Sequence, residues 1–451
     1  MRSFGTPAKR GIIEGAMKRA TGTAATKLVA TSIGIAREPS ASPRLSPETA
    51  AAKSAKWWRD IGWGLVVIVA GRHLETADVP AVHARRTRRD LRLDACRGLA
   101  LWFIFIDHIP DNSLSWLTLR NYGFSDTSEV FVFISGYTCM LAYGGAWRQQ
   151  GWRTTAVRAL RRAWEIYAAF LVLLIAYVAL VWVVGGGARY LDETNTGFFF
   201  RDAGPTIVHA VVLQFAPVNT DILLTFALLH LSFPVLLWLM TRSATVTLVL
   251  SFLLYLMVQL FSWHVPAWPS GELYFNPFAW QFLFVIGCWY AYEGTSRLRP
   301  LLQSQTLLVL ALSYLVFSLV IALSWEFKSL EAVMPAAVTN LIYPIYKSHL
   351  APVRLLHFLS LAFVTSRLTP ADWQGPIKPV MTAMIRCGEN SLSIYCLGVL
   401  LAFLGRVVLS DVSGEVAMQI VVSVAGIAIM VIAATLLTWE SQLDRRGPKL
   451  F

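Results

Sequence analysis

Long apolar stretches alternate with short polar connections from about residue 90 to the C-terminus. An α-helix crosses the hydrocarbon core of a bilayer with about 20 apolar residues, and about ten stretches approach that length. Their approximate bounds are 97–111, 126–145, 163–184, 221–240, 245–263, 278–294, 305–325, 350–366, 388–409 and 416–438. The pattern predicts an all-α fold, a polytopic integral membrane helical bundle of about ten transmembrane helices.

Positive charge is unevenly distributed over the connections between these stretches. Basic residues concentrate in every second connection, at Arg148, Arg153, Arg158, Arg161, Arg162, Arg242, Arg297, Arg299, Arg367, Lys378 and Arg386. The remaining connections hold Arg120, Arg189, Arg201, Lys328 and Lys347. Because cytoplasmic loops carry the excess of Lys and Arg, this asymmetry predicts an N-in, C-in topology with an even number of spans.

The chain before the first span has a different character. Residues 1–85 are rich in Ala, Ser, Thr, Pro and Arg, and they predict a basic, largely disordered N-terminal extension. Within it, 56–71 combines three Trp with an apolar run too short to span, which favours a helix lying in the membrane interface. Residues 86–451 are predicted to form the membrane domain.

Composition narrows the class of protein. Of 451 residues, 56% are hydrophobic and only 15% charged, which is too little charge for a soluble protein of this size. The net charge of +12 follows the loops and the termini, so it indicates membrane topology and no nucleic-acid partner. The five Cys show neither metal-ligand nor disulfide spacing, and no metal site is expected.

Ionisable residues interrupt the first apolar stretch. Arg97 and His108 are eleven positions apart, so on a helix they share one face within roughly 20° and lie about 16 Å apart along the axis. Asp94 lies one turn before Arg97 on nearly the same face. Ionisable groups at membrane depth are functional candidates by default. The alternatives are an Arg that snorkels to the surface and a His satisfied by a neighbouring helix.

Acidic and basic groups mark the starts of the next two spans. Asp126 and Glu129 lie one turn apart, and Asp126 could simply cap its helix, whereas Glu129 is a full turn further in. The basic patch before the third span consists of Arg158, Arg161 and Arg162. It is either a phosphate clamp or a signal of topology alone, and Glu165 is placed to orient Arg162.

Two further polar groups precede later spans. Arg354 and His357 are three residues apart on an otherwise apolar helix, and Lys347 lies on about the same face seven residues before Arg354. Glu389 and Asn390 open the ninth span. A partly exposed helix start would explain Lys347, but it explains Arg354 less well and His357 poorly, so these residues are candidate binding residues.

These motifs together resemble a known family. The phrases that carry the resemblance are DACRGLALWFIFIDHIP, FSDTSEVFVFISGY, LRRAWEIY, YFNPFAWQFLFVIG, HLAPVRLLHF and GENSLSIYCLGVLL. Arg97 followed by ten residues and His108 is similar to the signature of the membrane acyltransferase-3 superfamily, and the phrases in order resemble its OpgC family. Members of the superfamily often have the motif Arg-x-x-Arg before the third span. If the motif starts at Arg162, its second position holds Glu165 and the chain departs from the pattern. If it starts at Arg158, Arg161 is in the second position and the motif is kept.

The resemblance implies a multi-pass protein of the bacterial inner membrane that acylates osmoregulated periplasmic glucans. The acyl group would be succinyl, taken from cytoplasmic succinyl-CoA, an acyl-CoA co-substrate and no permanently bound cofactor. Another acyl group, another envelope polysaccharide, or a glycan transporter without acyl transfer are the competing hypotheses. The sequence does not indicate an oligomeric state.

The resemblance also implies roles for the candidate residues. His108 would be the general base toward the sugar hydroxyl, with Asp111, Asp126 or Glu129 as its orienting group. Arg97, together with Arg158, Arg161 or Arg162, would hold the CoA phosphates. The substrate-binding candidates are Arg354, His357, Lys347, Glu389 and Asn390, and Arg354 in particular would face the carboxylate of the succinyl group.

Overall fold

The computed structural model describes residues 90–184, 189–327, 329, 335–369 and 378–446. These residues form helices and no strand, apart from an isolated bridge between Pro266 and Glu272. The predicted extension 1–85, with its interfacial helix at 56–71, lies outside the described residues. The packing below belongs to one compact unit, Arg88–Leu323, Val333–Val364 and Ile377–Phe451. A second unit groups Met1–Thr87, Ser324–Ala332 and Thr365–Pro376, and few of its residues are described.

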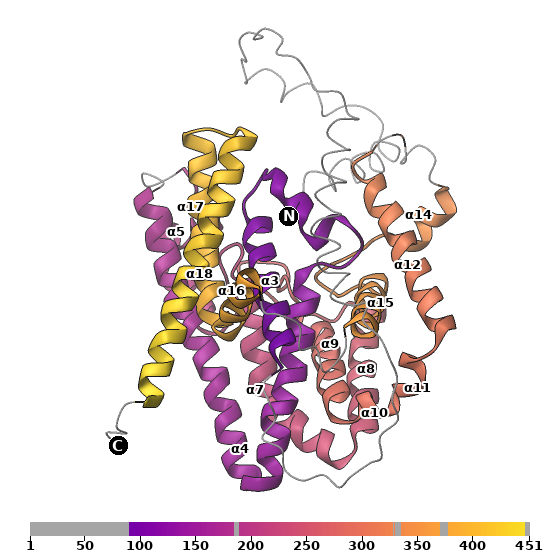
Figure 1. The fold of residues 1–451 in the computed structure, drawn as a ribbon. Helices are drawn as coiled ribbons and strands as arrows, with labels where there is room; N and C mark the ends of the chain where they lie inside the picture. Colours follow the sequence, from indigo (N-terminus) through magenta and orange to yellow (C-terminus); the bar gives the residue numbers. More distant parts are fainter. Residues whose placement is uncertain (1–89, 185–188, 328, 330–334, 370–377, 447–451) are drawn as a thin grey trace. The chain divides into compact units, whose positions relative to one another are not determined.

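The helices follow one another along the chain in the order labelled in Figure 1. They are α3 (Leu91–His108), η1 (Ser113–Leu117), η2 (Leu119–Asn121), α4 (Thr127–Val184), α5 (Phe198–Arg201), α6 (Ala203–Val211), α7 (Asp221–Arg242), α8 (Ala244–Phe261), α9 (Pro277–Trp289), η3 (Tyr290–Gly294), α10 (Thr295–Arg297), α11 (Arg299–Leu302), α12 (Gln305–Ser324), α14 (Ala336–Ile342), α15 (Pro352–Leu368), α16 (Pro379–Glu389), α17 (Ser391–Asp411) and α18 (Val416–Arg446). The all-α prediction is thus confirmed for the described residues.

Among the described residues, six helices are long and apolar enough to cross a membrane, namely α4, α7, α8, α12, α17 and α18. Among them α4 has 58 residues and contains two of the predicted spans, merged across a break at Gly151, where φ is 77° and ψ is 174°. The shorter or more polar α3, α9 and α15, which coincide with three further predicted spans, are not among the six. The described chain is therefore a helical protein with several helices of membrane-spanning character.

The first helix is displaced from the predicted 97–111. It begins at Leu91 because Asp90 caps it, with Oδ1 accepting a hydrogen bond from the Arg92 amide at 3.0 Å. It ends at His108, two residues before Pro110, whose ring cannot continue a helix. The prediction began too late because it followed apolar content and ignored the cap. Asp111, with a φ of 57°, consequently does not continue the face that carries His108.

Helix α3 packs against α16, α17 and α4 (Figure 1). At its crossing with α16 the two backbones touch at glycines. A Cβ on Gly98 would lie 1.8 Å from the Met384 carbonyl oxygen, and one on Gly388 would lie 1.9 Å from the Asp94 carbonyl oxygen. Only glycine permits this approach at either position, so the crossing fixes α3 along and around its axis.

A buried core surrounds α9, which packs against α4, α7 and α8. Trp280, Leu283 and Phe284 on α9 are fully buried. Helices α4 and α9 approach closely at Gly136, since a Cβ there would lie 2.0 Å from the Phe284 carbonyl oxygen. In contrast, many large apolar side chains of α8, α12 and α18 are exposed, which is the surface expected to face lipid.

Candidate active site

Four charged side chains from three parts of the chain form a buried ion cluster. Arg354 of α15 donates from Nε to Glu129 Oε1 at 2.8 Å, and its Nη2 lies 2.7 Å from the same oxygen in an ion pair. Nη2 also donates to Asp126 Oδ2 at 3.2 Å, and Lys347 Nζ approaches that oxygen at 2.7 Å. Glu129 is 0% and Arg354 2% exposed. Two cations and two carboxylates therefore balance each other inside the protein.

Asp126 and Glu129 additionally form a reciprocal cap at the start of α4. The Ser128 amide donates to Asp126 Oδ1 at 2.8 Å, and the Asp126 amide donates to Glu129 Oε2 at 2.9 Å. This is the geometry of a capping box, and it confirms the capping alternative considered for Asp126. Both oxygens of Glu129 are engaged, so the carboxylate is fixed by Arg354 on one side and by the helix start on the other.

The segment that carries Lys347 is held by hydrogen bonds to its backbone. All four consecutive carbonyls of residues 347–350 accept from α8, α9 or the cap of α9. The donors are Trp280 Nε1 to Lys347, the Asn276 amide to Ser348, Gln259 Nε2 to His349 and the Tyr255 hydroxyl to Leu350, at 3.2, 3.1, 2.7 and 2.8 Å. The segment between α14 and α15 is therefore fixed in position, and with it Lys347, as a preorganised site requires.

The ammonium of Lys347 stays charged in this setting. Burial, the largest single effect, lowers the pKa of Lys347, but the Asp126 carboxylate together with Tyr274 and Glu129 raises that pKa above its usual value. The same ammonium lies 5.3 Å from the centre of the Phe275 ring, in cation–π range. A quarter of the Lys347 side chain nevertheless remains accessible.

His357 binds the segment that leads into α4. Its Nδ1 accepts a hydrogen bond from the Ser125 amide at 3.2 Å and lies 2.7 Å from Ser125 Oγ. A Cβ on Gly123 would lie 2.0 Å from His357 Nε2, so this glycine makes room for the ring. His357 therefore holds the backbone at Ser125, the residue directly before Asp126, and so helps to position the ion cluster.

His108, the last residue of α3, has a buried Nδ1 with no hydrogen-bond partner among the described residues. The charges of Lys347, Arg120 and Asp126 all act on its ring. His108 thus lies within electrostatic range of two members of the ion cluster, Lys347 and Asp126. The structure does not give Nδ1 the orienting hydrogen bond to Asp126 or Glu129 that the sequence left open.

The neighbouring Asp107 is held from the connection after α3. The Thr118 hydroxyl donates to Asp107 Oδ1 at 2.7 Å. Arg120 Nη1 donates to the Asp107 carbonyl oxygen at 3.3 Å but lies 3.8 Å from Oδ1, too far for a hydrogen bond. The side chain of Arg120 is 27% accessible, in contrast to the buried side chain of Arg354 at 3%.

At the other end of α3, Arg97 donates from Nη2 to Thr138 Oγ1 at 2.5 Å. Arg97 and Arg162 both lie within electrostatic range of the buried Cys139. Glu165 orients Arg162 at 3.0 Å, as expected from the spacing, and also approaches Arg161 at 3.5 Å. Arg158 is exposed and makes none of the ion pairs of the described chain.

Glu389 and Asn390 lie apart from the ion cluster. They follow Gly388, which touches Asp94 at the opposite end of α3 from His108. The Asn390 side chain donates to the Ala434 carbonyl oxygen and to Thr438 Oγ1, at 3.3 and 2.9 Å, and so joins the junction between α16 and α17 to α18. The predicted contact of Glu389 and Asn390 with the substrate stays a prediction, since the two residues are not part of the ion cluster.

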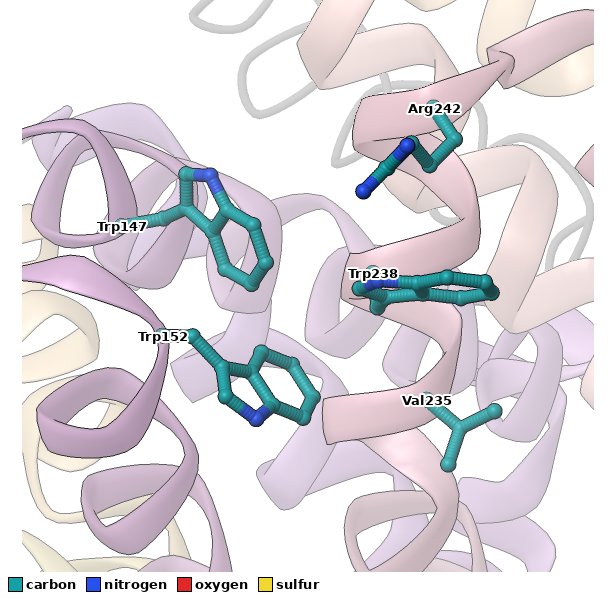
Figure 2. A pocket seen from close by; sticks show the side chains of 5 residues that line it. All are labelled: Trp147, Trp152, Val235, Trp238 and Arg242. Atoms are coloured by element: carbon teal, nitrogen blue, oxygen red, sulfur yellow. The ribbon is translucent and has the colours of Figure 1, made fainter.

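An aromatic cleft of about 460 Å³ lies where α4 breaks, beside the end of α7. Figure 2 shows its lining: Trp147 and Trp152 on α4 face Val235, Trp238 and Arg242 on α7. The two α4 indoles pack edge to face at 5.1 Å, and the Arg242 guanidinium lies 5.6 Å from the Trp238 ring. Trp and Arg gathered at one end of a bundle are typical of a membrane interface.

Sequence reasoning missed several residues of this architecture. His230 is buried on α7, with Nδ1 2.8 Å from the Phe226 carbonyl oxygen and Nε2 3.5 Å from Cys139 Sγ. A lone His inside an apolar run was the available signal. Ser125 and Thr118 gave no such signal, because a hydroxyl residue in a loop has many ordinary roles.

Comparison with known families decides the classification. The family model described as OpgC protein matches residues 89–442. The chain belongs to the OpgC family. OpgC membership implies an acyltransferase, and the match covers every residue of the ion cluster together with α3. No curated protein and no solved structure matches the chain significantly. Among the described residues, no group of three or more His, Cys, Asp or Glu is placed to hold a metal ion.

Proposed function

We propose that this OpgC chain is an O-acyltransferase that moves a succinyl group from cytoplasmic succinyl-CoA to hydroxyls of osmoregulated periplasmic glucans. Family membership supports acyl transfer. The observation that carries the reaction is the placement of His108, which ends a helix whose other end holds Arg97 and whose buried Nδ1 lacks a partner in the described chain. A ring nitrogen in that condition is available to a substrate hydroxyl.

The proposed chemistry needs one base. His108 takes the proton of the glucan hydroxyl while the oxygen attacks the thioester carbon, so a C–O bond forms and the C–S bond breaks. The proton then passes from His108 to the leaving CoA sulfur. No covalent enzyme intermediate is required, although an acyl-histidine variant would use the same residue. The ion cluster of Asp126, Glu129, Lys347 and Arg354 acts as the scaffold beside the base.

The donor is proposed to enter from the end of α3 that holds Arg97. Arg97 and Arg162 act on a common buried neighbour, which supports one cationic mouth for the CoA phosphates. Arg158 is the arginine of the patch that no ion pair of the described chain engages, and Arg161 shares Glu165 with Arg162. About 16 Å of helix separates Arg97 from His108, a length that an extended pantetheine arm can bridge.

We further propose ten spans with both termini in the cytoplasm of a bacterium, in its inner membrane. The aromatic cleft of Figure 2 supports a membrane interface at the break in α4, where the basic patch also begins. Two spans would lie within α4, and α3, α9 and α15 would span with the help of neighbouring helices that shield their polar or short ends. The glucan acceptor would meet His108 from the opposite side.

The decisive experiment compares periplasmic glucans from a deletion strain complemented with wild type, His108→Ala or His264→Ala. His264 is a matched control because its half-exposed ring contacts only a nearby loop. The mass and charge of the glucans are measured in strains whose membranes contain equal amounts of the wild-type or variant protein. Wild type and His264→Ala should restore a succinyl mass increment with added negative charge, and His108→Ala should not.

Other outcomes separate the competing hypotheses. An increment of a different acyl mass without added charge would keep acyl transfer and replace the donor. Unchanged glucans with wild type would remove this acceptor and point to other envelope polysaccharides. Full acylation with His108→Ala would end its role as the base, and a transporter would then be the better hypothesis.

A further inference from the structure

The cations around His108 differ in what they already bind. Arg354, which the sequence singled out for the succinyl carboxylate, is 3% accessible and is engaged by both Glu129 and Asp126. A ligand carboxylate could reach it only by displacing a buried ion pair, which is strongly unfavourable. The acyl carboxylate therefore needs another partner in this neighbourhood.

Arg120 and Lys347 meet that requirement. Their side chains are 27% and 25% accessible. Arg120 lies beyond hydrogen-bond distance of the Asp107 carboxylate, at 3.8 Å, and Thr118 donates to the same oxygen at 2.7 Å. Of the five N–H donors of its guanidinium, one is directed at the Asp107 backbone, so most are available to a planar carboxylate.

The two cations approach the base from different elements. Arg120 belongs to η2 and contacts Asp107, the residue next to His108. Lys347 stands on the clamped segment before α15 and is bound to Asp126 at 2.7 Å. Both charges act on the ring of His108. Arg120 thus contacts the end of α3, and Lys347 is bound to Asp126, six residues after Arg120 in the chain.

We propose that Arg120 and Lys347 form a recognition site for the terminal carboxylate of a dicarboxylic acyl group whose thioester lies at His108. The inference rests on the proposed acyl transfer and specifies its donor. In a succinyl group, three C–C bonds of about 1.5 Å place the carboxylate carbon about 4 Å from the thioester carbon. A cationic pair beside the base is therefore at a suitable position, and a neutral acyl group would gain nothing from it.

The test measures donor selectivity with the full-length protein in lipid nanodiscs and glucans isolated from a deletion strain. The two donors are succinyl-CoA and butyryl-CoA, which have the same chain length and differ in the terminal carboxylate. Wild type should prefer succinyl-CoA in kcat/KM. Arg120→Gln should lower that preference by roughly 10- to 100-fold, the value of a charge-assisted hydrogen bond, and should leave butyryl transfer nearly unchanged.

Two further variants control for structure. Arg201→Gln removes an exposed arginine that pairs with Asp192 in another connection, and its donor preference should equal that of wild type. Lys347→Arg keeps the charge and the pair with Asp126, so it should retain the preference, whereas Lys347→Gln should reduce it. Thermal unfolding of each variant identifies any loss of fold.

The possible results separate this inference from the proposed function. An unchanged donor preference in Arg120→Gln, or an equal loss with both donors, would overturn the carboxylate site and leave acyl transfer standing. Wild type that uses both donors equally would do the same. Wild type that transfers neither group to glucan would instead remove the proposed function.

Discussion

Arg354 and Glu129 lie 225 residues apart in the chain and form a buried pair in which two guanidinium nitrogens share one carboxylate oxygen. The pair joins the start of α15 to the start of α4. Because both side chains are sealed from solvent, its role is to hold these two helix starts together next to His108. Arg354, a candidate substrate contact, and Glu129, a candidate orienting group for His108, thus bind each other in the folded protein.

Removal of Arg354 should therefore reduce stability before it alters substrate recognition. Arg354→Gln leaves the buried charges of Glu129 and Asp126 poorly compensated, which should cost about 3–5 kcal/mol of unfolding free energy. Membrane abundance and thermal unfolding by fluorescence-detected size exclusion measure the loss. The double variant Arg354→Gln with Glu129→Gln should recover part of it. A fully stable single variant with a raised KM for the donor would instead favour direct substrate contact.

His357 provides a second test of positioning against binding. His357→Ala removes the acceptor of the Ser125 amide, which should cost about 1–3 kcal/mol of stability and lower kcat by disturbing the approach to Asp126. Thermal unfolding and initial acylation rates are measured together. An unaltered unfolding temperature with a raised KM for glucan would contradict this role and return His357 to the substrate-binding residues.

The arginine patch should determine affinity for the donor. Arg158→Ala and Arg162→Ala should each raise KM for acyl-CoA roughly 10-fold, since each would lose a charge-assisted phosphate contact, and kcat should change little. Kinetics with acyl-CoA and with acyl-pantetheine, which lacks the nucleotide phosphates, distinguish phosphate binding from general damage. Arg148→Ala, in the same basic connection, is the control. Equal KM values for all three variants would favour topology as the sole role of the patch.

The crossing of α3 and α16 gives a steric prediction. Gly98→Ala would place a methyl group 1.8 Å from the Met384 carbonyl oxygen, and separation of the helices should cost at least about 1–3 kcal/mol. Gly145→Ala is the matched control, since nothing lies within 4 Å of its added Cβ. Unfolding temperatures of the two variants are compared. If Gly98→Ala is as stable as Gly145→Ala, the contact does not fix α3.

Local rules predicted much of this architecture. Helical periodicity placed Arg97 and His108 on one helix, and the spacing of Asp126 and Glu129 gave the cap that the structure contains. The pair of Arg162 and Glu165 likewise followed from adjacent turns. Each of these features depends on residues within about three turns of one helix, where geometry is fixed by the backbone alone.

Long-range partners could not be predicted in the same way. Nothing near Glu129 in the chain indicates that Arg354 binds it, or that Ser125 meets His357. The predicted helix bounds were wrong at Asp90, where a polar cap starts the helix before the apolar residues begin. They were also wrong around Gly151, where the helix continues through a polar stretch. The assignment of Arg354 to substrate was reasonable for an isolated cation and changed only when its carboxylate partners became visible.

The glycine contacts of α3 have a consequence for how the donor is chosen. A helix that cannot slide past Met384 or turn away from Gly388 of α16 holds Arg97 and His108 at fixed positions in the bundle. If the donor binds as proposed, α3 works as a molecular ruler, and the distance from cationic mouth to imidazole is a fixed length that the cofactor arm must match. Acyl carriers with a shorter arm would bind at the mouth and leave their thioester out of reach of His108.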